Sequence, residues 1–296
     1  MKVLKNSAIY LVANFLTKGI SILLIPILTK YLAPESYGYV LLFSALLVFF
    51  NPLLYCGSVD MIAIDYFKEK ELFSKTLRNS TTSVIYVTIL STLLFALFSP
   101  LLTRFFELPF WAIVILPITG LLSYTLELLL LLLRYKGKHI SYLTATSFKT
   151  VVEVGVSLVG LILLNWGWFS RVLGVIAGFV VAAVFLMQLI PFHSLIGKLK
   201  FTDFKMVIRR GAPFIVAQFL VIAFVSIDKL FISQYFTRHE LGLYGIAFQI
   251  SSLLAVFSAS FASVLQPMQY KLGANLTEEN KLKLIEITYL YVGVLL

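Results

Sequence analysis

Charged residues are scarce in this sequence. Asp, Glu, Lys and Arg make up only 13% of its 296 residues, whereas soluble domains usually contain about 25%. Apolar residues make up 60%, and the mean hydropathy is +0.96. This composition excludes an ordinary soluble domain. It predicts an all-α polytopic membrane protein.

Residues that build metal and catalytic sites are also few. The single cysteine, Cys56, excludes an internal disulfide and is interpreted as a small apolar helix residue. His139, His193 and His239 are scattered without metal-ligand spacing, and there is no glycine-rich phosphate loop and no Ser–His–Asp arrangement. We therefore predict no enzyme, no catalytic residue, no metal and no cofactor.

Long apolar runs divide the sequence into eight complete spans and the beginning of a ninth. Since about 20 helical residues cross the hydrocarbon core of a bilayer, each complete run is long enough for a transmembrane helix. The N-terminus lacks a short apolar region with a cleavage site, so the first run is expected to be retained. The expected spans are residues 7–32, 38–62, 81–103, 110–133, 142–164, 170–193, 212–236 and 242–267, then 285 onward.

Basic residues alternate between rich and poor connections. The rich set contains Lys2, Lys5, Lys68, Lys70, Lys75, Arg78, Arg134, Lys136, Lys138, Lys198, Lys200, Lys205, Arg209, Arg210, Lys271, Lys281 and Lys283. The poor set contains Lys30, Arg104, Arg171 and Arg238. Because basic loops stay in the cytoplasm, the N-terminus is predicted to be cytoplasmic. The loops are interpreted mainly as topological anchors, with binding of anionic lipid head groups as an alternative, and the net charge of +10 does not predict nucleic-acid binding.

The first span has a counterpart later in the chain. Residues 7–16 (SAIYLVANFL) resemble residues 211–220 (GAPFIVAQFL), an offset of 204 residues, and Gly38 matches Gly242 at the same offset. Six spans per repeat give both copies one orientation, so an axis along the membrane normal should relate them. We expect a six-helix N-terminal lobe (1–205) and a partial C-terminal lobe (206–296) with helices 7, 8 and the start of 9. Two full copies would need about 410 residues, so we expect a C-terminally truncated piece of a longer transporter.

Charges inside the apolar spans are the main functional signal. A lysine near the centre of a membrane helix costs about 2.5–3.5 kcal/mol on insertion scales, and Lys18 occupies such a position in the first span. Asn14 lies one turn before it on the same face. A chain that accepts such costs several times is expected to line a polar cavity. We therefore predict a substrate cavity that contains Asn14, Lys18, Lys149 and Lys229.

Carboxylates in the spans are predicted either to bind a coupling ion or to pair internally; they are Glu127, Glu153 and Asp228. Lys149 and Glu153 share a helical face at a spacing of four residues, which fits both an ion pair and a cavity wall. Asp228 and Lys229 are adjacent and point about 100° apart. We therefore expect them to form no same-face pair, and each to need its own partner or a hydrated cavity.

Two positions keep alternative interpretations. Asp60 lies near the interfacial end of the second span, so its membership of the cavity is open. Lys18 has a structural alternative to its role in the cavity, namely an ion pair with Glu127 or Glu153.

The start of the chain carries a family resemblance. Residues 6–10 lead into LLIPILTKYLAPESYG at residues 23–38. This resembles the opening of bacterial polysaccharide-repeat-unit flippases of the Wzx type, in the polysaccharide transporter family of the multidrug/oligosaccharidyl-lipid/polysaccharide superfamily. The most specific parts are Ile-Pro-Ile-Leu-Thr (25–29) and Leu-Ala-Pro-Glu-x-Tyr-Gly (32–38). Residues 211–242, with the acidic–basic pair 228–229, are similar to the family's seventh and eighth helices.

The resemblance implies two six-helix lobes that form a V and work by alternating access. It implies a substrate of oligosaccharide on undecaprenyl pyrophosphate, moved from the inner to the outer leaflet of the bacterial inner membrane. The translocated oligosaccharide would enter the biosynthesis of the O-antigen of lipopolysaccharide, of capsule or of exopolysaccharide. The implied partners are a coupling H+ or Na+, membrane lipids and other membrane proteins of polysaccharide assembly. The predicted lysines agree with it, because cations in a low dielectric attract a pyrophosphate.

Other functions stay open at this stage. A cation-coupled drug or small-molecule exporter would share the fold, although a cavity lined by lysines favours an anionic substrate. A membrane glycosyltransferase, glycan polymerase or ligase is disfavoured by the short loops on both faces. Repeated charges inside the spans disfavour a scaffold without transport activity.

Overall fold

The computed structural model describes residues 19–20, 24, 26–66, 70–190, 195–198 and 200–251, with further positions at 277, 281–283, 285–286 and 289. Across this described part the chain forms helices joined by short connections, without a strand. Six helical segments there are long and apolar enough to cross a membrane. They correspond in order to the second to seventh expected spans. The prediction of an all-α polytopic membrane protein is therefore confirmed.

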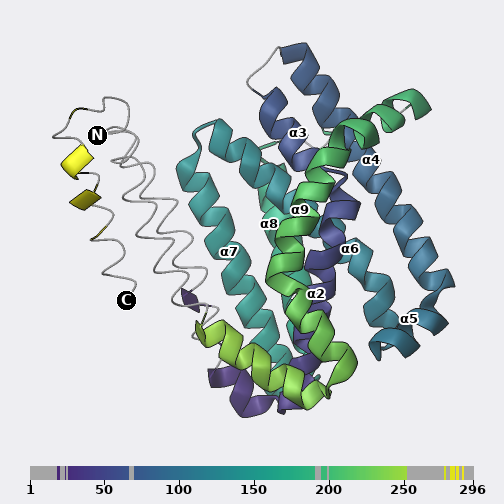
Figure 1. Ribbon diagram of the computed structural model, residues 1–296, viewed down its shortest axis with the longest axis vertical. Helices are drawn as coiled ribbons and strands as arrows, with labels where there is room; N and C mark the ends of the chain where they lie inside the picture. The colour runs from purple at the N-terminus through teal and green to yellow at the C-terminus, as the bar shows by residue number, and fades with distance from the viewer. Residues whose placement is uncertain are drawn as a thin grey trace.

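The helices follow one another with short connections. In chain order they are α2 (Pro34–Tyr55), α3 (Ser58–Asp65), α4 (Lys70–Leu97), α5 (Ser99–Phe106), α6 (Phe110–Tyr135), α7 (His139–Leu158), the π-helical segment η1 (Val159–Leu163), α8 (Trp168–Met187) and α9 (Phe201–Tyr235). Helical backbone resumes at residues 238–251. Figure 1 shows α9 lying along α2 in the middle of the molecule, with α7 on one side and α4 on the other.

The observed helix boundaries differ from the expected spans in two ways. The helices α4 and α9 begin at Lys70 and Phe201, well before the expected starts at 81 and 212. Hydropathy marks only the lipid-embedded part of a helix, whereas polar residues with good helix propensity extend it beyond the bilayer. The second expected span is also interrupted, because Cys56 and Gly57 adopt positive φ angles of 53° and 65° and separate α2 from α3.

Close packing joins α7 and α8 into a hairpin. Gly174 and Gly178 face α7, and a Cβ on Gly174 would lie 2.5 Å from the carbonyl oxygen of Glu153. A Cβ on Gly178 would lie 2.9 Å from the carbonyl oxygen of Lys149. Small residues four apart let membrane helices approach at backbone distance. This packing fixes Lys149 and Glu153 directly against α8.

The interior of the helical bundle is built around α6. Tyr124, Leu128 and Leu129 on this helix are at most 1% exposed. The helix packs against α2, α4 and α8. The buried faces of α6 thus fix the direction in which Glu127 projects.

Contacts between α2 and the 238–251 helix follow the repeat offset. The backbone carbonyl of Arg238 lies against Gly38, and the carbonyl of Pro34 lies against Gly242, so neither glycine has room for a Cβ. Pro34 and Arg238 are 204 residues apart, as are Gly38 and Gly242. Reciprocal contacts of this kind are what a two-fold relation between two copies produces. The two contacts thus follow the same offset of 204 residues as the sequence repeat.

Candidate functional site

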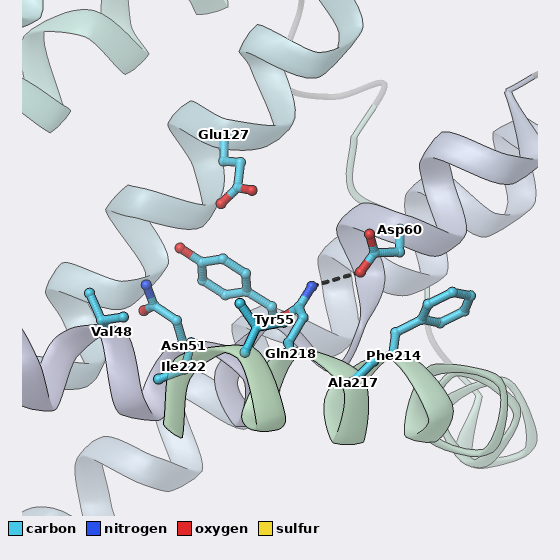
Figure 2. Close-up of a pocket in the computed structure, with 10 residues that line it drawn as sticks. Val48, Asn51, Tyr55, Asp60, Glu127, Phe214, Ala217, Gln218 and Ile222 are labelled. Atoms are coloured by element: carbon cyan, nitrogen blue, oxygen red, sulfur yellow. Dashed lines mark hydrogen bonds between the residues drawn. The ribbon is translucent and has the colours of Figure 1, made fainter. Parts of the chain in front are cut away.

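A polar pocket opens where α2, α3, α6 and α9 meet. Its volume is about 370 Å³, and Figure 2 shows the side chains that surround it. The residues that line it are Val48, Asn51, Tyr55, Asp60, Glu127, Phe214, Ala217, Gln218, Val221 and Ile222. Among these lining residues, two are carboxylates and none is basic. The pocket therefore carries a negative charge within a largely apolar wall.

Helical spacing explains how each wall reaches the pocket. Asn51 and Tyr55 lie one turn apart on α2, and Phe214 and Gln218 lie one turn apart on α9. The amide Nε2 of Gln218 donates a hydrogen bond of 2.6 Å to Oδ2 of Asp60 on α3 (Figure 2). This bond crosses from the expected N-terminal lobe to the first helix of the expected C-terminal lobe.

Polar atoms in this pocket lack partners. The Oδ1 atom of Asn51 and the hydroxyl of Tyr55 are buried and have no hydrogen-bond partner among the described residues. Tyr55 is 4% exposed, and its ring packs against Tyr124 with centroids 5.3 Å apart. In Figure 2 its hydroxyl points into the pocket toward Glu127. Buried polar atoms in native structures usually have hydrogen-bond partners, so a molecule in this pocket that supplies hydrogen-bond donors would complement these two atoms.

Glu127 is the predicted residue that lines this pocket. Its side chain is accessible there, and the charged groups that influence it are Asp60 and Arg134. Asp60, whose membership of a cavity was open in the sequence, also lines the pocket. Asn14 and Lys18 fall outside the described residues.

Lys149 and Glu153 form the predicted i,i+4 ion pair on α7. A third charge completes the cluster, since Nη2 of Arg171 on α8 lies 2.6 Å from Oε1 of Glu153. The ammonium of Lys149 also lies 5.1 Å from the ring centroid of Phe179. Two cations share one carboxylate, so the cluster keeps one surplus positive charge. From the sequence, Arg171 was assigned only to a connection with few basic residues. The connection between η1 and α8 is short, so Arg171 must lie opposite residues 153–157 of α7, and this spacing could have predicted the contact.

Asp228 and Lys229 do form a pair, and the expectation that they cannot was wrong. Nζ of Lys229 lies 3.6 Å from Oδ1 of Asp228. The four-carbon stem of lysine is flexible enough to turn back along the helix, which the 100° separation of the Cβ directions does not prevent. Asp228 also accepts hydrogen bonds from the backbone N–H of Lys229, at 2.8 Å, and from the hydroxyl of Tyr244. The Lys229 ammonium lies 3.7 Å from the ring centroid of Phe248.

The predicted site residues thus fall into separate groups. The pair 149–153 lies on α7, the pair 228–229 lies on α9, and Glu127 lies in the polar pocket. Neither described lysine lines that pocket.

A further ion pair, between α3 and α9, was not foreseen. Asp65 is fully buried, and Nη2 of Arg210 lies 3.1 Å and 2.9 Å from its two carboxylate oxygens. The Thr76 hydroxyl donates a third bond of 2.7 Å to the same carboxylate. Asp65 is the last residue of α3 and Arg210 lies in the basic first part of α9, where the sequence offers no signal that separates a structural pair from a solvated charge.

The helical arrangement is similar to that of two solved membrane transporters. One similar solved structure is an inward-facing multidrug resistance MATE family transporter of the MOP superfamily, with a TM-score of 0.61 and 18% identity over 95% of this chain and 66% of the other. A second is MATE in complex with MaD3S, with a TM-score of 0.60 and 17% identity over 98% of this chain and 68% of the other. The chain therefore spans about two thirds of the length of these transporters, and the likeness shows the fold.

The family itself is identified by sequence. The family model described as polysaccharide biosynthesis protein matches residues 27–288. The chain belongs to this family, in agreement with the resemblance seen at residues 23–38. A comparison with curated proteins finds no match.

Proposed function

We propose that the protein is a flippase that moves undecaprenyl-pyrophosphate-linked oligosaccharide across the bacterial inner membrane by alternating access. The glycan would enter O-antigen, capsule or exopolysaccharide synthesis. The observation that carries the proposal is membership of a polysaccharide biosynthesis family on a transporter fold. On this proposal the protein is a transporter and not an enzyme.

The charge cluster on α7 and α8 supports an anionic substrate. Lys149, Glu153 and Arg171 leave one positive charge uncompensated inside the apolar part of the helices. Charges in low-dielectric surroundings interact more strongly than in water, so this surplus charge suits a pyrophosphate. Asn14, Lys18 and Lys229 remain proposed members of the same substrate path.

Alternating access requires two bodies that separate and rejoin. We propose residues 1–205 and 206–296 as parts of two lobes, with the N-terminus in the cytoplasm as the basic loops predict. The bonds Gln218–Asp60 and Arg210–Asp65 then join the lobes in the present state. We propose that H+ or Na+ drives the change between the two states of the lobes. The candidate carboxylates that would bind this ion are Glu127, Glu153 and Asp228.

The second candidate function is export of a cation. The acidic pocket favours cations, and one structural relative is a multidrug resistance transporter. A cation-coupled drug exporter on the same fold is therefore the alternative. A glycan polymerase or ligase has weaker support, because the family match and fold point to transport.

The deciding experiment is translocation in liposomes that contain the purified protein. A labelled undecaprenyl-pyrophosphate oligosaccharide should reach the opposite leaflet, and Lys149→Ala and Lys18→Ala should slow this movement. Lys136→Ala removes an exposed loop charge and serves as the matched control, with unchanged rate. Efflux of a cationic dye without lipid movement would instead support the exporter. Glycan elongation without movement would support the polymerase.

A further inference from the structure

We propose that the polar pocket between α2, α3, α6 and α9 is the subsite for a sugar of the substrate, and that it accepts neutral or amino sugars and disfavours acidic ones. This inference rests on the proposed function. It assigns Glu127 and Asp60 to substrate selection, and it assigns the pyrophosphate to another site.

Most of the hydrogen-bonding groups in the pocket are acceptors. Ionised Asp60 and Glu127 can only accept hydrogen bonds, and the free Oδ1 of Asn51 accepts as well. One amide N–H of Gln218 already donates a hydrogen bond to Asp60. The Tyr55 hydroxyl is the exception, since it both donates and accepts. A complementary ligand must therefore supply many O–H or N–H donors, which sugar hydroxyl and ammonium groups do and an ionised phosphate does not.

Two buried polar atoms show where such a ligand would form hydrogen bonds. Asn51 Oδ1 and the Tyr55 hydroxyl have no partner within the described residues, and both belong to the α2 wall. A buried acceptor without a donor is costly, and a ligand that satisfies it gains affinity. A hydroxyl-rich ring placed against this wall would satisfy both atoms at once.

The size of the pocket favours a sugar over a bare cation. A volume of 370 Å³ corresponds to about twelve water molecules at roughly 30 Å³ each. Sites for small organic molecules usually measure about 300–1,000 Å³. The side chains of Val48, Val221 and Ile222 also lie in the lining, where they offer apolar contact to the carbon atoms of a ring.

The charge of the pocket sets the selectivity. Both ionisable lining residues are acidic, and the basic neighbour that influences Glu127, Arg134, is exposed to solvent two turns further along α6. A sugar carboxylate in this pocket would meet two like charges in a medium of low dielectric. An amino sugar would instead be attracted. The surplus positive charge at Lys149 and Arg171 lies outside this lining and suits the pyrophosphate.

The test compares three lipids that differ in one sugar. Undecaprenyl pyrophosphate carrying glucose, glucosamine or glucuronic acid is offered to the protein in liposomes, and initial translocation rates are measured. The wild-type protein should move the glucuronic acid lipid at least about tenfold more slowly than the glucose lipid. In Glu127→Gln and Asp60→Asn, which keep the side-chain shape and remove a charge, this ratio should fall toward one. Asp203→Asn removes a carboxylate of α9 outside the pocket and should leave the ratio unchanged.

Several results would overturn the subsite. They are equal rates for the three lipids in the wild-type protein, an unchanged ratio in both pocket variants, or loss of Na+ or pH dependence in these variants with the sugar ratio retained. The last result would make the pocket a cation site. If the wild-type protein moves none of the lipids, the proposed flippase function fails separately. The same ratios are then measured by equilibrium binding of the three lipids to the detergent-solubilised protein, and equal binding would refute the subsite.

Discussion

Removing Arg210 should open the contact between α3 and α9. Its guanidinium holds both oxygens of Asp65, at 2.9 Å and 3.1 Å, and Asp65 is fully buried. The variant Arg210→Ala would remove the guanidinium from this buried carboxylate, while Thr76 still donates a hydrogen bond to it. A buried charge that loses its counter-charge destabilises the state that buries it.

The magnitude follows from the burial of both partners. Breaking a fully buried ion pair costs about 3–5 kcal/mol. The Arg210 side chain is 38% exposed, so water already screens part of the attraction. We therefore expect a loss of about 1–3 kcal/mol in the free energy that keeps the contact closed. This corresponds to an increase of about 5- to 150-fold in the equilibrium constant for opening.

Cys56 provides the assay. It is the single cysteine, it is 1% exposed, and its carbonyl packs on Gly211 beside Arg210. A thiol-reactive dye should label it only when the contact opens, and the labelling rate follows the opening equilibrium when reclosing is fast. We expect labelling to accelerate by about 5- to 150-fold in Arg210→Ala.

Two further variants decide whether this reasoning holds. Arg209→Ala removes an exposed neighbouring charge and should label like the wild-type protein. Adding Asp65→Asn to Arg210→Ala removes the buried carboxylate charge and should slow labelling again. Equal labelling of Arg210→Ala and Arg209→Ala would refute the claim that this ion pair holds α9 against α3.

Three other predictions concern packing and charge. Gly174→Leu should force α7 and α8 apart, because a Cβ there lies 2.5 Å from the Glu153 carbonyl oxygen; the cost of about 1–3 kcal/mol should lower the midpoint of thermal unfolding, whereas Gly155→Leu, with open space around its Cβ, should not. Glu153→Gln should strand two cations and cost about 3–5 kcal/mol, measured as folded protein in detergent, with partial recovery when Lys149→Met is added. At the start of the 238–251 helix, the backbone N–H and the hydroxyl of Thr237 donate hydrogen bonds to the Glu240 carboxylate and lower its pKa below the ordinary value of 4.5. The stabilisation by this cap is therefore complete above pH 4.5 and is lost as the pH falls through the lower pKa of the folded state. Amide hydrogen exchange at Thr237 should accelerate only below that range.

Runs of apolar residues were sufficient to place the six membrane spans in the described part of the chain, because the energy of burying side chains in lipid dominates the sequence pattern. They could not locate the break at Cys56–Gly57, since positive φ angles at a turn leave little trace in hydropathy. They also could not extend α4 and α9 to Lys70 and Phe201, where polar helix formers lie beyond the apolar run.

The pairing of the site residues was predictable only within one helix. Lys149 and Glu153 share a face, so their ion pair follows from spacing. The contact between Arg171 and Glu153 requires the α7–α8 hairpin, and that of Gln218 with Asp60 requires the packing of α9 on α3. Contacts between helices depend on side-chain directions and close approaches that a single sequence does not reveal.

An intramembrane charge indicates a polar site, but its partners decide which ligand that site can bind. Glu153 is taken up by two cations, so the α7–α8 cluster presents a positive charge. Glu127 and Asp60 share a pocket without a basic lining residue, so that pocket presents negative charge and hydrogen-bond acceptors. A lipid-linked glycan carries complementary groups for both sites, namely an anionic pyrophosphate for the positive cluster and hydroxyl donors for the acidic pocket. A single cationic drug would use only the acidic pocket. The two hypotheses therefore differ most sharply at Arg171, since its removal should impair movement of the glycan lipid and leave export of a cation intact.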